Sequence, residues 1–139
     1  MAHTVEEIMT RDPRTVDASE TIANAARVMR DSDIGDVIVM DGDEIACIVT
    51  DRDIAVRAVA EGRDPDSTRV TEVCTTGVET IEPEASVDDA LSRMREKDIR
   101  RLPVAKDGRP VGIVSLGDLA VEREPDSTLA DISAASPDN

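Results

Sequence analysis

The chain contains no phenylalanine, tyrosine or tryptophan among its 139 residues. Proteins that hold single-stranded nucleic acids stack the bases on aromatic side chains, so this absence argues against that function. The formal net charge of −15 repels the phosphates of nucleic acids and the headgroups of anionic membranes. We therefore expect neither a nucleic-acid partner nor a membrane partner.

Long apolar runs are also missing. The longest runs, such as the one around 37–40, cover at most about five residues, far fewer than the roughly 20 that span a bilayer. The acidic segment 1–7 has neither the basic start nor the apolar stretch of a signal peptide. These features predict a cytoplasmic protein. Hydrophobic residues nevertheless form 40% of the chain, which is enough for a folded core.

Residues for catalysis or metal binding are scarce. The single histidine, His3, lies near a chain end, so neither a catalytic triad nor a zinc site is expected. The sequence has no P-loop and no nucleophile beside a base. We predict that the protein is not an enzyme, has no metal site and requires no cofactor. The alternative, a hydrolase that uses its carboxylates, would show slow turnover of ATP with a divalent metal.

The two cysteines, Cys47 and Cys74, are too few and too far apart for a metal motif. The favoured interpretation is that both are small core residues, kept reduced in the cytosol. The alternative is a redox switch.

The chain repeats itself. A shift of 65 residues aligns 5–57 with 70–122 without a gap, and 15 of the 53 pairs are identical. Such self-similarity indicates a duplicated folding unit. We assign the two copies to residues 8–65 and 73–130. The polar segment 61–68, which contains glycine and proline, is the predicted linker.

Each copy predicts the order β-α-β-β-α, a mixed α/β class. Short helical turns are expected at 5–9 and 70–74, and brief strands at 14–16 and 78–81. Asp-Gly turns between apolar runs then predict hairpins over 37–49 and 102–114. The last helices are expected to begin at Asp51 and Leu116.

Between the first strand and the hairpin, each copy predicts an amphipathic helix. Ser86 is the expected N-cap of the second helix, and Ser19 or Thr21 that of the first. Apolar residues recur at helical spacing and predict the buried faces. These are Ile22, Ala25, Ala26 and Met29 in the first copy and Val87, Ala90, Leu91 and Met94 in the second. Residues 128–132 are either a third opening turn or part of a frayed acidic end.

A hydroxyl residue, two spacers and an aspartate follow the second hairpin strand of each copy. These residues are Thr50 with Asp53 and Ser115 with Asp118. A carboxylate can accept both hydrogen bonds of a ribose diol, and the N–H groups at a helix start favour a phosphate. The same spacing is that of a capping box, and spacing alone favours capping.

Three segments, together with the repeat, resemble the CBS domain family. They are IVTDRDI at 48–54, IRRLPV at 99–104 and GIVSLGD at 112–118. The resemblance runs from about residue 5 to 123 and is closest to stand-alone bacterial pairs of the hypoxic-response type. It implies a pseudo-twofold CBS pair, or Bateman module, with two clefts for AMP, ADP, ATP or S-adenosylmethionine. It also implies a disc-like homodimer.

The resemblance assigns residues to both clefts. The aspartates would bind ribose, the arginines phosphate, and the first strands would form the floor under adenine. Cleft A then comprises Thr15, Val16, Thr50, Asp53, Arg100 and Arg101, and the weaker cleft B comprises Thr80, Ile81, Ser115 and Asp118.

The two clefts are unequal. Where cleft A has two arginines, cleft B has Gly35 and Asp36, so we expect nucleotide in cleft A. Seven of the 16 basic residues fall within 93–109, and part of this cluster is expected to be a solvated helix face. Cys47 replaces the glycine found at Gly112, and its sulfur is expected to crowd the sugar in cleft A.

The predicted function is therefore regulatory binding. The module would sense energy state or a metabolite through an adenine ligand and act in trans on an unidentified protein. The alternative is a protein interaction module without a ligand, or a redox-responsive one.

Overall fold

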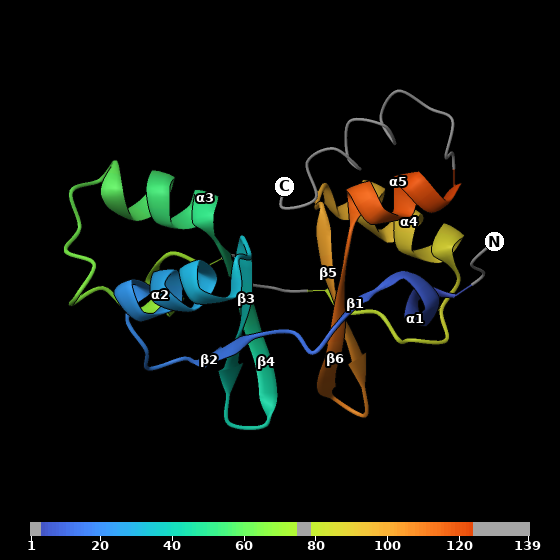
Figure 1. Ribbon diagram of the computed structural model, residues 1–139, viewed down its shortest axis with the longest axis horizontal. Helices are drawn as coiled ribbons and strands as arrows, with labels where there is room; N and C mark the ends of the chain where they lie inside the picture. Colours follow the sequence, from blue (N-terminus) through green and yellow to red (C-terminus); the bar gives the residue numbers. More distant parts are fainter. Residues whose placement is uncertain (1–3, 75–78, 124–139) are drawn as a thin grey trace. The chain divides into compact units, whose positions relative to one another are not determined.

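The computed structural model describes residues 4–74 and 79–123 and has the predicted mixed α/β class (Figure 1). The chain divides into two compact units. One, here called the first-repeat unit, is Arg14–Val78. The other, the second-repeat unit, combines Met1–Pro13 with Glu79–Asn139.

The first-repeat unit contains a three-stranded sheet in the order β2-β3-β4. The first pair is parallel and the second is an antiparallel hairpin. Helices α2 and α3 lie beside this sheet (Figure 1). The elements are β2 (Thr15–Asp17), α2 (Ile22–Ser32), β3 (Asp36–Asp41), β4 (Glu44–Thr50), α3 (Asp51–Ile54), the π-helical turn η1 (Ala55–Val59) and the 3-10 turn η2 (Val70–Glu72).

The second-repeat unit has a sheet in the order β1-β6-β5, in which both pairs are antiparallel. Helices α4 and α5 pack on it, and α1 contacts both β6 and α5. The elements are α1 (Val5–Ile8), β1 (Thr10–Arg11), α4 (Val87–Lys97), β5 (Arg101–Lys106), β6 (Arg109–Ser115) and α5 (Leu116–Arg123). The strand predicted at 78–81 is reduced to a parallel bridge between Ile81 and Val104 in the described residues.

The opening turn of each repeat packs in the unit of the other repeat. The N–H of Val5 donates to the carbonyl of Ala85 at 2.9 Å, and the N–H of Val70 donates to that of Glu20 at 3.0 Å. These two bonds are equivalent under the 65-residue shift. The compact units are therefore offset from the sequence repeats 8–65 and 73–130, whose boundaries stay a prediction.

Both amphipathic helices begin at a hydroxyl cap. The Thr21 Oγ1 accepts from the N–H of Asn24 at 3.2 Å, and the Ser86 Oγ accepts from that of Asp89 at 3.0 Å. These contacts confirm the caps and select Thr21 over Ser19. The hydroxyl of Ser19 instead donates to the Asp17 carboxylate.

The predicted helix faces are largely confirmed. Ile22, Ala25 and Met29 are buried in α2, as are Val87, Ala90 and Met94 in α4. The prediction was wrong for Ala26, which is exposed. It lies at the margin of the apolar stripe, on the side that faces solvent.

The hairpins form as predicted, over β3–β4 and β5–β6. Between β5 and β6, Asp107 and Gly108 both have positive φ, 53° and 80°. A two-residue hairpin turn of this kind favours Asp-Gly. Between β3 and β4, Gly42 has a φ of 62°.

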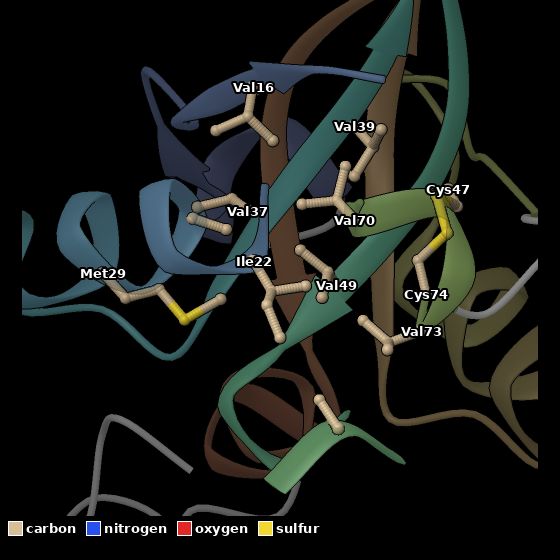
Figure 2. Packing of buried hydrophobic residues seen from close by; sticks show 12 residues of the cluster. Val16, Ile22, Met29, Val37, Val39, Cys47, Val49, Val70, Val73 and Cys74 are labelled. Carbon is tan, nitrogen blue, oxygen red and sulfur yellow. A yellow bond between two sulfur atoms is a disulfide. The ribbon is translucent and has the colours of Figure 1, made fainter. Parts of the chain in front are cut away.

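The prediction of two reduced core cysteines was wrong, because Cys47 and Cys74 form a disulfide within the core of the first-repeat unit (Figure 2). Both residues are buried, at 1% and 5% exposure. Their Cα atoms are 6.1 Å apart although the residues are 27 positions apart in sequence. The docking of η2 against β4 brings them within bonding range.

Candidate functional site

The first hydroxyl–aspartate motif lies where β4 ends and α3 begins. The N–H of Asp53 donates to the Thr50 Oγ1 at 3.0 Å, and the N–H of Thr50 donates to the Asp53 Oδ2 at 3.0 Å. This is a complete capping box. The side chain of Asp53 is only 14% exposed, so its carboxylate is held in one place.

The capping box uses one carboxylate oxygen and leaves the other facing a cation. The Asp53 Oδ1 lies 3.9 Å from the Nε of Arg57, one helical turn later. The Nη1 of Arg57 also donates to the carbonyl of Val73 at 3.4 Å. The capping box therefore occupies Oδ2 of Asp53 and leaves Oδ1, the oxygen beside Arg57, outside the cap.

The sheet of the first-repeat unit brings the start of β2 and the end of β4 to the same end. Thr15 is paired with Ile38, which is paired in turn with Ile48, two residues before Thr50. Thr15 is exposed at this end. The side chain of Val16, by contrast, packs in the core. Only the backbone of Val16 could therefore contact a ligand.

The second motif lies at the end of β6. The Ser115 Oγ accepts from the N–H of Asp118 at 3.0 Å. Asp118 is exposed, in contrast to the half-buried Asp53.

The arginine pair lies next to this second motif within the same unit. Arg101 is the register partner of Ser115, and the carbonyl of Arg100 accepts from the N–H of Leu116 at 2.7 Å. Arg100 is exposed and Arg101 half-buried. The pairing of these arginines with the Thr50 motif in cleft A stays a prediction.

The basic cluster on α4 is engaged locally. Arg93 donates from Nη1 to the carbonyl of Thr80 at 2.8 Å and pairs with Asp89 at 3.5 Å. Lys97 pairs with Glu79 at 3.3 Å. These contacts fit the predicted solvated helix face. The hydrogen bond from Arg93 also holds the backbone at Thr80. The neighbouring cleft B residue, Ile81, is buried at 1% exposure.

Two features of the site were not predicted. Arg57 escaped notice although its i,i+4 spacing from Asp53 is a known signal for an ion pair on a helix. The second feature is the position of the Cys47 sulfur, which lies in the core and is bonded to Cys74, while the expected crowding of a sugar stays a prediction.

Within the two described stretches, no three histidine, cysteine or acidic side chains gather in a way that could hold a metal ion. The helices of those stretches are all too short or too polar to cross a bilayer.

The family model described as CBS domain matches this chain twice, at residues 5–59 and 70–123. The chain belongs to the CBS domain family. The CBS domain-containing protein YhcV of Bacillus subtilis is 40% identical over 119 residues, which cover 86% of this chain and 84% of YhcV.

Solved CBS structures share the fold. Hypoxic Response Protein I, solved with two coordinated zinc ions, is 35% identical with a TM-score of 0.74, covering 84% of this chain and 96% of that one. The CBS domain pair of protein MJ0100 is 26% identical with a TM-score of 0.78, covering 89% and 98%. That structure is a complex with 5′-methylthioadenosine and S-adenosyl-L-methionine. CBS pairs of this fold can therefore bind adenosyl ligands.

Proposed function

We propose that this CBS pair is a regulatory module that binds an adenine ligand, namely AMP, ADP, ATP or S-adenosylmethionine, and so senses energy state or a metabolite. The observation that carries the proposal is the Thr50–Asp53 pair at the end of β4. Its carboxylate is held by one backbone N–H at 3.0 Å, and its second oxygen, 3.9 Å from the Nε of Arg57, is the proposed acceptor for the ligand. The adenosyl complex of the MJ0100 pair supports the same ligand class.

In the proposed cleft A, each group has a chemical task. Asp53 accepts hydrogen bonds from the ribose diol, and Thr50 adds a hydroxyl beside it. Arg100 and Arg101 bind phosphate oxygens, which guanidinium groups do well because their donors form a planar fork. The start of β2, at Thr15 and Val16, forms the floor beneath the adenine.

The proposed cleft B is the weaker site. It combines Ser115 and Asp118 with Thr80 and Ile81. Gly35 and Asp36 stand where cleft A has the two arginines. The carboxylate of Asp36 repels phosphate. Cleft B is therefore empty or binds a ligand without a phosphate.

The proposed signal is a change in population. A ligand that binds one arrangement of the two repeats more tightly shifts the equilibrium toward it. The module then acts in trans on a protein partner, or through its own assembly, which we propose is a homodimer. Binding rather than catalysis is the proposed activity.

The first test is an ultraviolet spectrum of the freshly purified protein. Since the chain has no aromatic residues, a bound adenine would dominate absorption near 260 nm. Denaturation and chromatography would then identify the ligand. If the spectrum is flat, thermal shift with each of the four ligands follows, because a ligand of the folded state stabilises it by RT ln(1 + [L]/Kd), about 2.7 kcal/mol at 100 Kd.

A co-purified adenine compound, or a clear shift with one of the four, supports the proposal. A flat spectrum with no shift from any of them contradicts it. That outcome would favour a protein interaction module that works without a ligand.

A further inference from the structure

The Cys47–Cys74 disulfide joins two parts of the first-repeat unit that are 27 positions apart in the sequence. Cys47 lies on β4, three residues before Thr50, and Cys74 follows the turn η2 (Figure 2). The bond therefore connects the strand that carries the proposed ligand site to the opening turn of the second repeat.

The equivalent contact in the second-repeat unit is not covalent. Under the 65-residue shift, Cys47 corresponds to Gly112 and Cys74 to Met9. There the Met9 side chain lies against Gly112, with its Sδ 2.5 Å from where a Cβ would be. An opening turn can thus dock on its strand without a disulfide. Val70 and Val73, both fully buried, also attach η2 to the core, so loss of the bond would loosen η2 without unfolding the unit.

A short path runs from the disulfide to the ligand site. Val73, next to Cys74, accepts from Arg57 through its carbonyl at 3.4 Å, and Arg57 faces the Asp53 carboxylate at 3.9 Å. Both distances are at the long end for such contacts. They therefore depend on η2 staying in place. Arg57 sits in the π-helical turn η1, a rare conformation that is frequent at functional sites.

We propose that the Cys47–Cys74 pair is a thiol–disulfide switch that sets the affinity of the Thr50–Asp53 site for its adenine ligand through Arg57. The proposal rests on the proposed function and adds its regulation. In the oxidised form η2 is tied to β4, Arg57 is held by Val73, and the Asp53 carboxylate is preorganised. In the reduced form η2 moves more freely, Arg57 loses its anchor, and the ligand binds more weakly because ordering the site costs free energy.

The reductant is a dithiol. Its thiolate attacks the Sγ of Cys74, which belongs to the more exposed of the two residues, at 5% against 1%. The S–S bond breaks, a mixed disulfide forms on Cys74, and Cys47 leaves as a thiolate that takes up a proton. The second thiol of the reductant then displaces Cys74, which is also protonated. Two electrons and two protons pass to the cysteines, and the reductant becomes a cyclic disulfide.

Burial makes this exchange conditional on local opening of η2. The sequence predicts a cytoplasmic protein, and most disulfides in the cytoplasm are transient or redox-sensing. A disulfide that is reduced and re-formed fits that compartment. A low-molecular-weight disulfide such as oxidised glutathione would supply the oxidant for the reverse step.

The test measures binding of AMP, ADP, ATP and S-adenosylmethionine by calorimetry to the full chain, oxidised or reduced with dithiothreitol. Alkylation and mass spectrometry establish the redox state, and circular dichroism establishes that both forms are folded. We expect a Kd at least about fivefold lower for the oxidised form, the lower end of ordinary allosteric coupling. The Cys47→Ala/Cys74→Ala variant should bind like the reduced form with or without dithiothreitol.

The Arg57→Gln variant tests the path. It should bring the ratio of reduced to oxidised Kd close to one, whereas Arg30→Gln, which removes the same charge from the exposed surface of α2, should preserve the ratio. Equal Kd values in the oxidised and reduced wild type overturn the switch and leave the proposed function standing. A full ratio in Arg57→Gln overturns the route through Arg57. If neither form binds any of the four ligands, the proposed function fails and the switch fails with it.

Discussion

The side chain of Met9 lies directly over Gly112. A Cβ placed on Gly112 would be 2.5 Å from the Met9 sulfur and 2.8 Å from the carbonyl oxygen of Thr10. β1 is paired with β6 at this point. Glycine is therefore required where the opening turn of the first repeat meets the sheet of the second-repeat unit.

Gly112→Ala should lower the free energy of unfolding by about 1–3 kcal/mol, the usual cost of overpacking. Urea unfolding would measure it. In the Met9→Ala background the added methyl should cost less, because the sulfur that it meets is gone. Strictly additive losses in the double variant would contradict the steric explanation.

Reduction of the disulfide should lower stability without unfolding the protein at room temperature. The bond closes a loop with a sequence separation of 27, for which the chain-entropy model gives about 3.5 kcal/mol. The buried side chains of Val70 and Val73 keep the first-repeat unit folded in the reduced state, although η2 moves more freely there. Urea midpoints measured with and without dithiothreitol should differ for the wild type and coincide for Cys47→Ala/Cys74→Ala. An unchanged wild-type midpoint would show that the bond contributes no stability.

Arg101→Ala should weaken binding of a phosphate-bearing ligand by about 1.5–3 kcal/mol, the range for a hydrogen bond to a charged group. Calorimetry with ATP gives the value. Lys106→Ala is the matched control, since it removes a nearby positive charge whose partner, Glu84, is on the surface. If both variants bind like the parent, the assignment of Arg101 to the phosphate is wrong.

Asp53→Asn should separate the capping role from the ligand role. The amide oxygen can still accept from the Thr50 N–H, so unfolding should change by less than about 1 kcal/mol, the usual worth of a cap. The loss of the charged acceptor should weaken ribose binding by about 1.5–3 kcal/mol. The same change at Asp118, the equivalent position in the second repeat, should leave nucleotide affinity almost unchanged. Equal losses at the two aspartates would contradict the unequal clefts.

Much of the fold followed from local patterns in the sequence. The caps at Thr21 and Ser86, the Asp107-Gly108 turn and the capping box at Thr50 each involve residues no more than three apart. Their hydrogen bonds form within one turn of chain, so residue type and spacing predict them. The duplication was equally visible, because its 65-residue period does not depend on the fold.

The candidate site was predictable only in part. The sequence singled out Thr50 and Asp53, and the structure shows how they are held. Their proposed partnership with Arg100 and Arg101 came from the family resemblance and still awaits its binding experiment. Arg57 was missed because its i,i+4 spacing from Asp53 is typical of any helical ion pair and does not by itself point to a ligand site.

The sequence by itself determined that this protein is a duplicated α/β module, because periodicity, caps and turns act over short distances, and its resemblance to the CBS domain family came from three short motifs. Only the tertiary structure decided that each opening turn docks in the unit of the other repeat. That exchange carries Cys74 to Cys47, Met9 to Gly112 and the Val73 carbonyl to Arg57. These contacts join residues far apart in the chain, where the free energy of burying apolar surface, rather than local spacing, selects the partner.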